Sequence, residues 1–226
     1  MKAFALFVAA ALIGVGAPSR AVDLAGIAGG NYQLPLMSMK AARFQSTVHQ
    51  QYDFSCGSAA VATLLRYHYG TAVDERLVFE EMFLRGDQPR IRREGFSLLD
   101  IKQYLERLGF QADGFELPLH KLVEAAYPAI VLVSDNGYHH FVVIKGLQGG
   151  RILLGDPAGG LRAMSQSSFE AIWMNRLLFV IHGWHGAVRF NDAAEWRTAP
   201  RSPLEQAVSR DSLSNITLLR PGGGDF

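Results

Sequence analysis

The chain contains one residue that can act as a strong nucleophile near neutral pH, the single cysteine Cys56. Apolar residues recur every three to four positions after it, which predicts a helix over residues 56–69 that ends at Gly70. Cys56 would lie at the start of this helix, where partial positive charge stabilises the reactive thiolate. A lone cysteine is more commonly an inert core residue, but an inert thiol has no reason to prefer a helix start. We also expect Gly57 to let a substrate approach the backbone closely.

A nucleophilic thiol needs a general base, and the base needs a group that orients it. His140 begins an apolar run at 140–145, which predicts a strand, and a glycine-containing turn at 148–150 leads to a second strand at 152–154. Asp156 follows the second strand and would lie near His140 across the ladder. Its carboxylate would accept the Nδ1–H of the imidazole, which selects the tautomer and favours the imidazolium.

Each of these residues also has a simpler explanation. A histidine in an apolar strand is usually a hydrogen-bonded core residue, and the pair Asp156-Pro157 is usually only a turn. The combination of a cysteine at a helix start with His and Asp on consecutive strands is what favours catalysis. His139 is an alternative base, because adjacent strand residues face opposite sides and periodicity does not choose between them.

The elements that must position these residues fall into two blocks along the chain. Helices come first, at 56–69, 74–84, 97–109 and 119–126, and the third begins with a capping box formed by Ser97 and Asp100. Strands follow at 129–134, 140–145, 152–154 and 177–181, with a helix at 168–174 before the last. This order predicts an α+β fold in which N-terminal helices pack on a C-terminal antiparallel sheet. We expect Leu77 and Leu108 to face the core, and we interpret the arginine-rich stretch 90–93 as a solvated loop.

Composition excludes several other functions. Hydrophobic residues make up 49% and charged residues 19% of the 226 residues, which is typical of a globular protein. The formal net charge of +1 leaves no basic excess for binding nucleic acid. The seven histidines form no His-Glu-x-x-His motif and there is no cysteine pair, so no metal site is predicted. A Gly-x-Ser-x-Gly elbow and a glycine-rich phosphate loop are also absent, and no cofactor is expected.

The amino terminus has the pattern of an export signal. Lys2 precedes an apolar, uncharged run over 3–16, and Ser19-Arg20-Ala21 places small residues where a signal peptidase cleaves. We therefore expect residues 1–21 to be a signal peptide, 22–46 an N-terminal lead without clear periodicity, 47–185 the core domain, and 186–226 a weakly ordered tail with a short helix at 204–208. No other segment is long and apolar enough to span a membrane, so no span is expected after cleavage.

Several motifs together resemble one known family. Gln50 stands six residues before Cys56, the strand after His140 reads His-Phe-Val-Val, Asp156-Pro157 follows 16 residues after His140, and Phe169 is followed by Trp173 in a Phe-x-x-x-Trp segment. Over about residues 48–181 this pattern resembles the papain-like, double-glycine (bacteriocin-processing) cysteine peptidases of family C39. Ser55 departs from the family, in which many members have Asp before the cysteine.

The resemblance implies roles for the individual residues. Cys56 would be the nucleophile, His140 rather than His139 the base, and Asp156 the group that orients His140. Gln50 would donate to the oxyanion together with the backbone N–H of Cys56. Gln51 is one residue away from the family spacing and is the second choice for this role.

The resemblance also implies a polypeptide substrate, cleaved after Gly-Gly or similar small residues. Stand-alone exported members resemble the peptidase of Fap functional-amyloid secretion operons, which implies a periplasmic enzyme with an outer-membrane secretion system or amyloid subunits as partners. Self-cleavage at Gly29-Gly30 is a further hypothesis. A non-catalytic adaptor that binds a secretion substrate is the alternative function, and acyl transfer on the same triad is a third.

Overall fold

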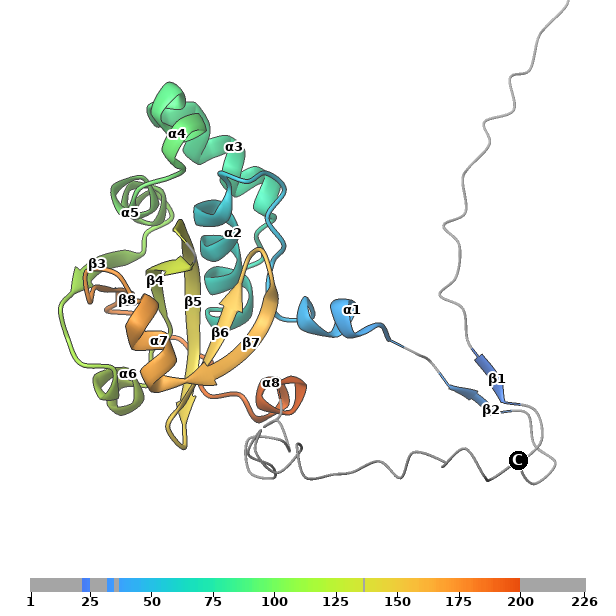
Figure 1. Cartoon of the computed structure of the whole chain (residues 1–226). Coiled ribbons are helices and arrows are strands. Elements are labelled where there is room, and N and C mark those ends of the chain that lie inside the picture. Colours follow the sequence, from blue (N-terminus) through green and yellow to red (C-terminus); the bar gives the residue numbers. More distant parts are fainter. Residues whose placement is uncertain (1–21, 25–31, 35–36, 136, 200–226) are drawn as a thin grey trace, which may run out of the picture. The chain divides into compact units, whose positions relative to one another are not determined.

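The computed structural model describes residues 22–24, 32–34, 37–135 and 137–199, and divides the chain into two units at Met39. The first unit contains an antiparallel pair formed by β1 (Val22–Leu24) and β2 (Tyr32–Leu34), with Val22 opposite Leu34 (Figure 1). The short helix α1 (Met39–Arg43) follows. The stretch 22–46, expected to lack regular elements, therefore contains three short ones. The expected signal peptide 1–21, the Gly29-Gly30 pair and residues 200–226, with the helix expected at 204–208, lie outside the described residues.

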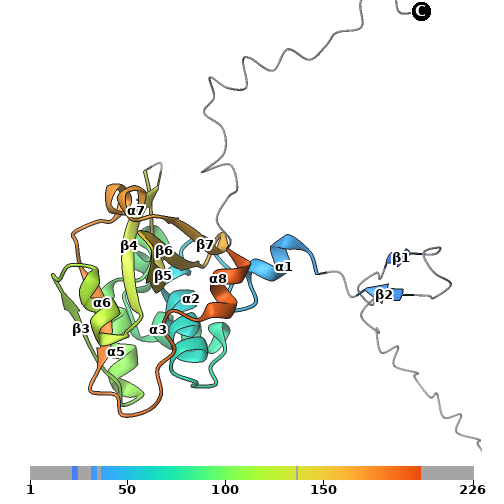
Figure 2. The same ribbon diagram turned by 90° about the horizontal axis from the view of Figure 1, so that it is seen from below.

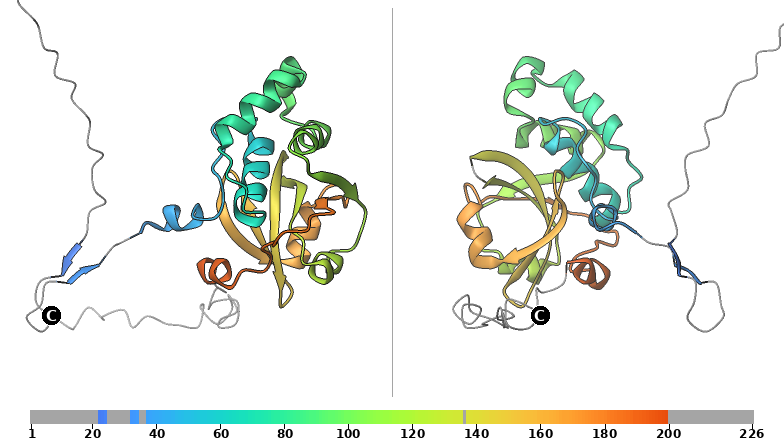
Figure 3. Two further views of the ribbon diagram at one scale, coloured as in Figure 1. Left: turned by 180° about the vertical axis from the view of Figure 1, so that it is seen from behind. Right: turned by 45° about the vertical axis from the view of Figure 1, so that its right-hand side comes forward.

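The helical layer of the second unit begins with α2 (Cys56–Thr63), which continues directly into a π-helix, η1 (Leu64–His68). It is followed by α3 (Glu75–Arg85), α4 (Gln88–Glu94) and α5 (Leu98–Arg107), which gather on one side of the sheet (Figures 1 and 3). The capping box of α5 forms as predicted, since Ser97 Oγ accepts from the N–H of Asp100 and the Asp100 carboxylate accepts from the N–H of Ser97. Gly109 ends this helix in the left-handed region, with φ +84°.

The second unit contains a six-stranded antiparallel sheet in the order β3-β8-β4-β5-β6-β7. Its strands are β3 (Gln111–Phe115), β4 (Ala129–Asp135), β5 (Tyr138–Gln148), β6 (Arg151–Asp156), β7 (Gly160–Ser165) and β8 (Leu178–His182). The predicted α+β architecture is confirmed. β3 and β7 were not predicted, because each contains glycine and polar residues that hide the alternation of a strand.

Apolar side chains of β5 alternate between two cores. Phe141 and Val143 pack with the buried residues of α2, α3 and α5. Val142 and Ile144 pack on the other face, with residues of α6 (His120–Ala125) and α7 (Gln166–Ile172). Figure 2 shows α6 and α7 on the outer side of the strands, away from α2. The strand that contains His140 is therefore held between two layers.

The prediction of a solvated loop at 90–93 was wrong, because these residues lie in α4. Asp87 accepts from the N–H of Arg90 at the start of the helix, Ile91 is fully buried, and the Arg90 guanidinium bonds Asp100 at 2.8 Å. The surrounding charged residues masked the one buried apolar residue of this helix, Ile91, in the sequence pattern. Leu77 and Leu108, expected in the core, are 56% and 43% exposed.

The first part of the expected tail is not loose. Residues 186–199 include α8 (Ala193–Thr198), and two backbone bonds tie this segment to the domain: Arg189 N–H to His68 O at 3.0 Å and Asn191 N–H to Lys145 O at 2.9 Å. Sequence periodicity could not reveal these contacts, since their partners lie far away in the chain. Among the described helices, none has the length and apolar character needed to cross a bilayer.

Candidate active site

Cys56 is the first residue of α2 and is 6% exposed. A tight turn precedes Cys56, in which the Ser55 hydroxyl donates to Tyr52 O and accepts from Tyr52 N–H, both at 3.0 Å. The first amides of a helix have no intrahelical acceptors and point toward whatever precedes the helix. The predicted placement of Cys56 at a helix start is confirmed.

His140 and Asp156 form a buried pair, each 5% exposed. His140 Nε2 lies 3.3 Å from Asp156 Oδ2. The sequence predicted this contact through Nδ1, which was wrong: Nδ1 is the nitrogen left over. It is buried and has no hydrogen-bond partner among the described residues. Because Asp156 holds Nε2, the other ring nitrogen remains available for a proton from a thiol.

The two histidine candidates separate by exposure. His139 is exposed, and no described contact of its ring with a carboxylate is found, whereas His140 is buried against Asp156. Both histidines line the cavity that Cys56 lines. Burial against Asp156, rather than strand alternation, is therefore what favours His140 as the base.

Asp156 is held as an anion by four groups. The N–H groups of Ala158 and Gly159 donate to Oδ1 at 2.9 and 3.2 Å, and the Arg162 guanidinium lies 3.1 Å from Oδ2, which also contacts His140. Burial by itself raises the pKa of Asp156. The hydrogen bond and charge of His140, the Ala158 N–H and the charge of Arg162 outweigh burial and hold this pKa below its usual range.

The thiol of Cys56 experiences opposing influences. Burial raises the pKa of Cys56, and the negative charge of Asp156 adds to the rise. Backbone N–H groups of Phe141, Gly57 and Cys56 itself lower it, but they do not overcome burial. The expectation that the helix start alone would favour the thiolate was therefore too simple. A cation beside the sulfur would lower this pKa, and His140 lines the same cavity as Cys56.

Gln50 lies beside the Asp156 turn. Its N–H donates to Pro157 O at 3.0 Å, and its side-chain Nε2 donates to Tyr52 O at 3.1 Å. Its Oε1 is buried without a partner among the described residues. The Gln50 side-chain amide thus donates to Tyr52 O and also interacts with the Tyr138 hydroxyl. Gln51 is exposed.

Tyr138 is a site residue that the sequence analysis missed. Its ring stacks on the His140 ring with centroids 5.3 Å apart and planes 25° apart, and its hydroxyl donates to Asp53 O at 2.8 Å. The available signal was its position two residues before His140, which puts both side chains on one strand face. Tyr138 limits the rotation of the imidazole and connects β5 to the loop that precedes Cys56.

A cavity of about 330 Å³ lies next to Cys56 and His140. Cys56 and His140 both line it, and its walls are largely apolar, with Phe96, Leu132 and Met174. Gly57, expected to make room for a substrate, has another reason to be glycine. A Cβ at this position would lie 2.8 Å from Phe96 Cβ, so the glycine lets α2 pack against the wall of the cavity.

Comparison with known proteins places this geometry in a family. Residues 45–183 match the Peptidase C39 family. The chain belongs to this family. Like other C39 domains it is therefore a cysteine peptidase with a papain-like fold.

Two curated C39 relatives carry the name "Probable functional amyloid protease FapD". The protein from Pseudomonas aeruginosa is 39% identical over 155 residues, which cover 69% of this chain and 68% of that protein. The protein from Pseudomonas fluorescens is 40% identical over 146 residues, which cover 65% and 64%. The chain thus matches about two thirds of each relative.

A solved structure agrees on the fold. The peptidase domain of Streptococcus ComA, a bifunctional ABC transporter, superposes with a TM-score of 0.50 at 23% identity. The match covers 60% of this chain and 96% of that domain. The helices and the six-stranded antiparallel sheet are thus those of a C39 peptidase domain.

Proposed function

We propose that this protein is an exported cysteine endopeptidase in which Cys56 is the nucleophile, His140 the general base and Asp156 the residue that orients His140. The observation that supports this assignment is the buried His140–Asp156 pair, whose Nδ1 has no partner, beside a cavity that Cys56 also lines. Nucleophile, base and orienter are the three groups that thiol catalysis requires.

In the acylation step, His140 Nδ1 takes the thiol proton and the Cys56 sulfur attacks the carbonyl carbon of the scissile peptide bond. The carbonyl oxygen becomes an oxyanion, which the Cys56 N–H and the side-chain amide of Gln50 stabilise. When the oxyanion collapses, the C–N bond breaks and His140 passes its proton to the leaving amine. Asp156 stabilises the imidazolium in the interval.

In the deacylation step, water adds to the thioester. His140 removes a proton from the water, which attacks the carbonyl carbon, and the sulfur leaves as the thiolate beside the imidazolium. The released acid and amine together gain one water. Acyl transfer would use the same acyl-enzyme but would join an amine in place of water, so the product masses separate the two reactions.

The proposed substrate is an exported polypeptide, cut after Gly-Gly or another pair of small residues. The two FapD relatives are named as amyloid proteases, which supports an amyloid subunit or its secretion apparatus as the partner. Phe96 and Phe141 are buried walls of the cavity that Cys56 lines, which supports a preference for small residues at the cleaved position. The N-terminal export pattern supports a periplasmic location.

The test uses purified mature protein and two matched peptides, one with a Gly-Gly site and one with Val-Val at the same positions. Mass spectrometry should find two fragments whose masses sum to the peptide plus one water, from the Gly-Gly peptide alone. Cys56→Ala should abolish cleavage. Cleavage that survives in Cys56→Ala would refute the proposal, and a Cys56→Ala strain that still exports its substrate would favour an adaptor.

A further inference from the structure

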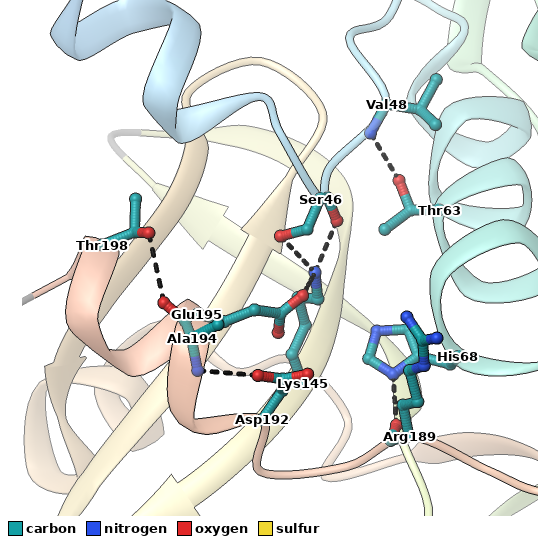
Figure 4. Close-up of polar contacts among 10 residues, drawn as sticks. All are labelled: Ser46, Val48, Thr63, His68, Lys145, Arg189, Asp192, Ala194, Glu195 and Thr198. Carbon is teal, nitrogen blue, oxygen red and sulfur yellow. Dashed lines mark hydrogen bonds and ion pairs between the residues drawn. The ribbon is translucent and has the colours of Figure 1, made fainter. Parts of the chain in front are cut away.

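A second buried polar cluster lies beside α8 (Figure 4). Its centre is Lys145, which is on the same strand as His140 and is fully buried. Its ammonium donates to Ser46 O, to Ser46 Oγ at 3.0 Å, and to Glu195 Oε1 in α8. Burying a lysine destabilises the fold unless its charge is paired, so the burial of Lys145 suggests a specific role for this cluster.

The second part of the cluster is His68, the last residue of the π-helix that continues α2. Two hydrogen bonds tie it to Arg189: the ring Nδ1 lies 2.6 Å from Arg189 O, and Arg189 N–H donates to His68 O at 3.0 Å. Because a carbonyl can only accept, Nδ1 carries the hydrogen. A π-helical turn widens the helix locally, and here it ends on the residue that makes this contact.

One short segment therefore contacts both the helix that begins at Cys56 and the strand that contains His140. Residues 189–195 bind the end of α2 through His68, and they bind β5 through Lys145, whose carbonyl also accepts from Asn191 N–H at 2.9 Å. Cys56 lies at the other end of the continuous helix formed by α2 and η1, and His140 lies five residues from Lys145 on β5.

The fit between this segment and β5 is close. The pairing of β5 with β6 is irregular between Ile144 and Gly146, which brackets Lys145. A Cβ on Gly146 would lie 2.3 Å from Asn191 Oδ1. The N-terminal side closes the same cluster: Ser46 contacts Lys145, and the nearby Val48 N–H donates to Thr63 Oγ1 on α2 at 2.9 Å.

We propose that Lys145, Glu195 and His68 are positioning residues, which let segment 189–195 set α2 against β5 and so set the sulfur of Cys56 against the imidazole of His140. The segment lies outside residues 45–183, the part that matches the family. The inference rests on the assignment of Cys56 and His140 made above. A shift of about 1 Å between reacting groups costs on the order of 100-fold in rate, so small movements of α2 matter.

The charges around the cluster support a role for Glu195 in particular. Burial lowers the pKa of Lys145, and the charge and hydrogen bond of Glu195 oppose that effect, with a smaller contribution from Asp192. Burial, and then the positive charge of Lys145, lower the pKa of His68 to about 3, so His68 is neutral. Without Glu195, the ammonium of Lys145 would keep, among the described residues, the neutral Ser46, the Tyr67 ring 5.5 Å away and the more distant charge of Asp192.

The experiment compares four variants of the mature chain: Glu195→Gln, His68→Leu, His68→Asn, and a control, Glu124→Gln, which removes an exposed α6 carboxylate paired with Lys121. Asn can place an amide N–H where Nδ1 of His68 lies, whereas Leu cannot donate. The measurements are the rate of Cys56 alkylation by iodoacetamide against pH, kcat and KM on the Gly-Gly peptide, and the thermal midpoint, with rates taken well below each midpoint.

We expect Glu195→Gln and His68→Leu to lower both kcat and the rate of alkylation below pH 8 by about tenfold or more, with little change in KM. His68→Asn should recover most of the loss, and Glu124→Gln should match wild type. If Glu195→Gln and His68→Leu lower the midpoint but leave the alkylation profile and kcat unchanged, the cluster only stabilises the fold and the inference is wrong.

A further arm separates this inference from the proposed function. If alkylation of wild-type Cys56 does not depend on His140, as tested with His140→Ala, the catalytic assignment fails and the positioning role fails with it. If wild type shows that dependence and Glu195→Gln retains it in full, only the positioning role is refuted.

Discussion

At the scale of single residues, the site is a short chain of charges and hydrogen bonds. Arg162 contacts Asp156, Asp156 contacts His140, and the free nitrogen of His140 shares a cavity with Cys56. Burial acts against the thiolate of Cys56 and against the anion of Asp156. Asp156 is nevertheless held as an anion by His140, the Ala158 N–H and Arg162.

Asp156→Asn should therefore lower kcat/KM by about 10²- to 10⁴-fold, because a neutral partner neither stabilises the imidazolium nor selects its tautomer. Peptide cleavage and iodoacetamide alkylation both measure this loss. The chain provides a matched control: Asp113 contacts His182 Nε2 at 2.7 Å on β3 and β8, where both side chains are partly exposed. Asp113→Asn should leave both rates near wild type, and an equal loss there would contradict the role of Asp156.

The stability of Asp156→Asn should depend on pH. The pKa of Asp156 is lowered in the folded protein, so its anion stabilises the fold fully above the unfolded value of about 3.9, and the contribution is lost as pH falls through the lower folded value. At neutral pH the variant should melt below wild type, and the difference should shrink in acid below about pH 4. A gap that widens on acidification would refute this account.

At the scale of elements, helix α2 needs close packing at both of its ends. At its start, Gly57 sits against Phe96, and at the far end of η1 His68 binds Arg189. The helix is buried along its whole length, from Cys56 to Thr63. The orientation of the nucleophile thus depends on contacts that a helical pattern in the sequence does not reveal.

Gly57→Ala tests the first of these contacts. In an unhindered helix, alanine in place of glycine stabilises by about 1 kcal/mol. Here the added Cβ would meet Phe96 Cβ at 2.8 Å, and such overpacking typically costs about 1–3 kcal/mol. Urea unfolding should therefore show a destabilised variant. A variant more stable than wild type would mean that the Phe96 wall yields freely.

At the scale of the whole molecule, the described part of the second unit is one catalytic domain whose two flanking segments meet at Lys145. Ser46 comes from the N-terminal side and Glu195 from the C-terminal side. The C-terminal segment, expected to be weakly ordered from residue 186, packs on the domain as far as Thr198, with Arg151 Nη2 donating to Ala199 O at 3.2 Å. The folded domain therefore extends beyond residues 45–183, the part that the family match covers.

Export predicts a mature polypeptide that begins at Val22. Expression of the full chain in a Gram-negative host, followed by fractionation and intact-mass measurement, should find this species in the periplasm. Cys56→Ala is the control for self-processing: a wild-type protein that begins after Gly30, with the variant beginning at Val22, would establish cleavage at Gly29-Gly30. Active wild type that begins at Val22 would refute self-cleavage, a mass that retains residues 1–21 would refute cleavage after Ala21 and favour an uncleaved N-terminal anchor, and recovery in the cytoplasm would refute export.

Local patterns in the sequence were enough for much of this protein. Three- and four-residue periodicity located α2, α3 and α5, the Ser97–Asp100 pair located a helix start, and alternation located four of the strands. These signals are local, because caps and amphipathic faces depend on neighbours a few residues away. The same signals, together with the family pattern, singled out Cys56, His140, Asp156 and Gln50.

Only the tertiary structure decided how those residues meet. In the fold, Asp156 contacts Nε2 of His140 and Tyr138 stacks on the imidazole. Gly57 packs against Phe96, and Lys145 is buried against Glu195. The physical reason is shared by the contacts of Asp156, Gly57 and Lys145: each depends on burial and on a partner that is distant in the sequence and brought close by the fold. Lys145 and Glu195 are 50 residues apart, and no local pattern marks a lysine that the fold will enclose.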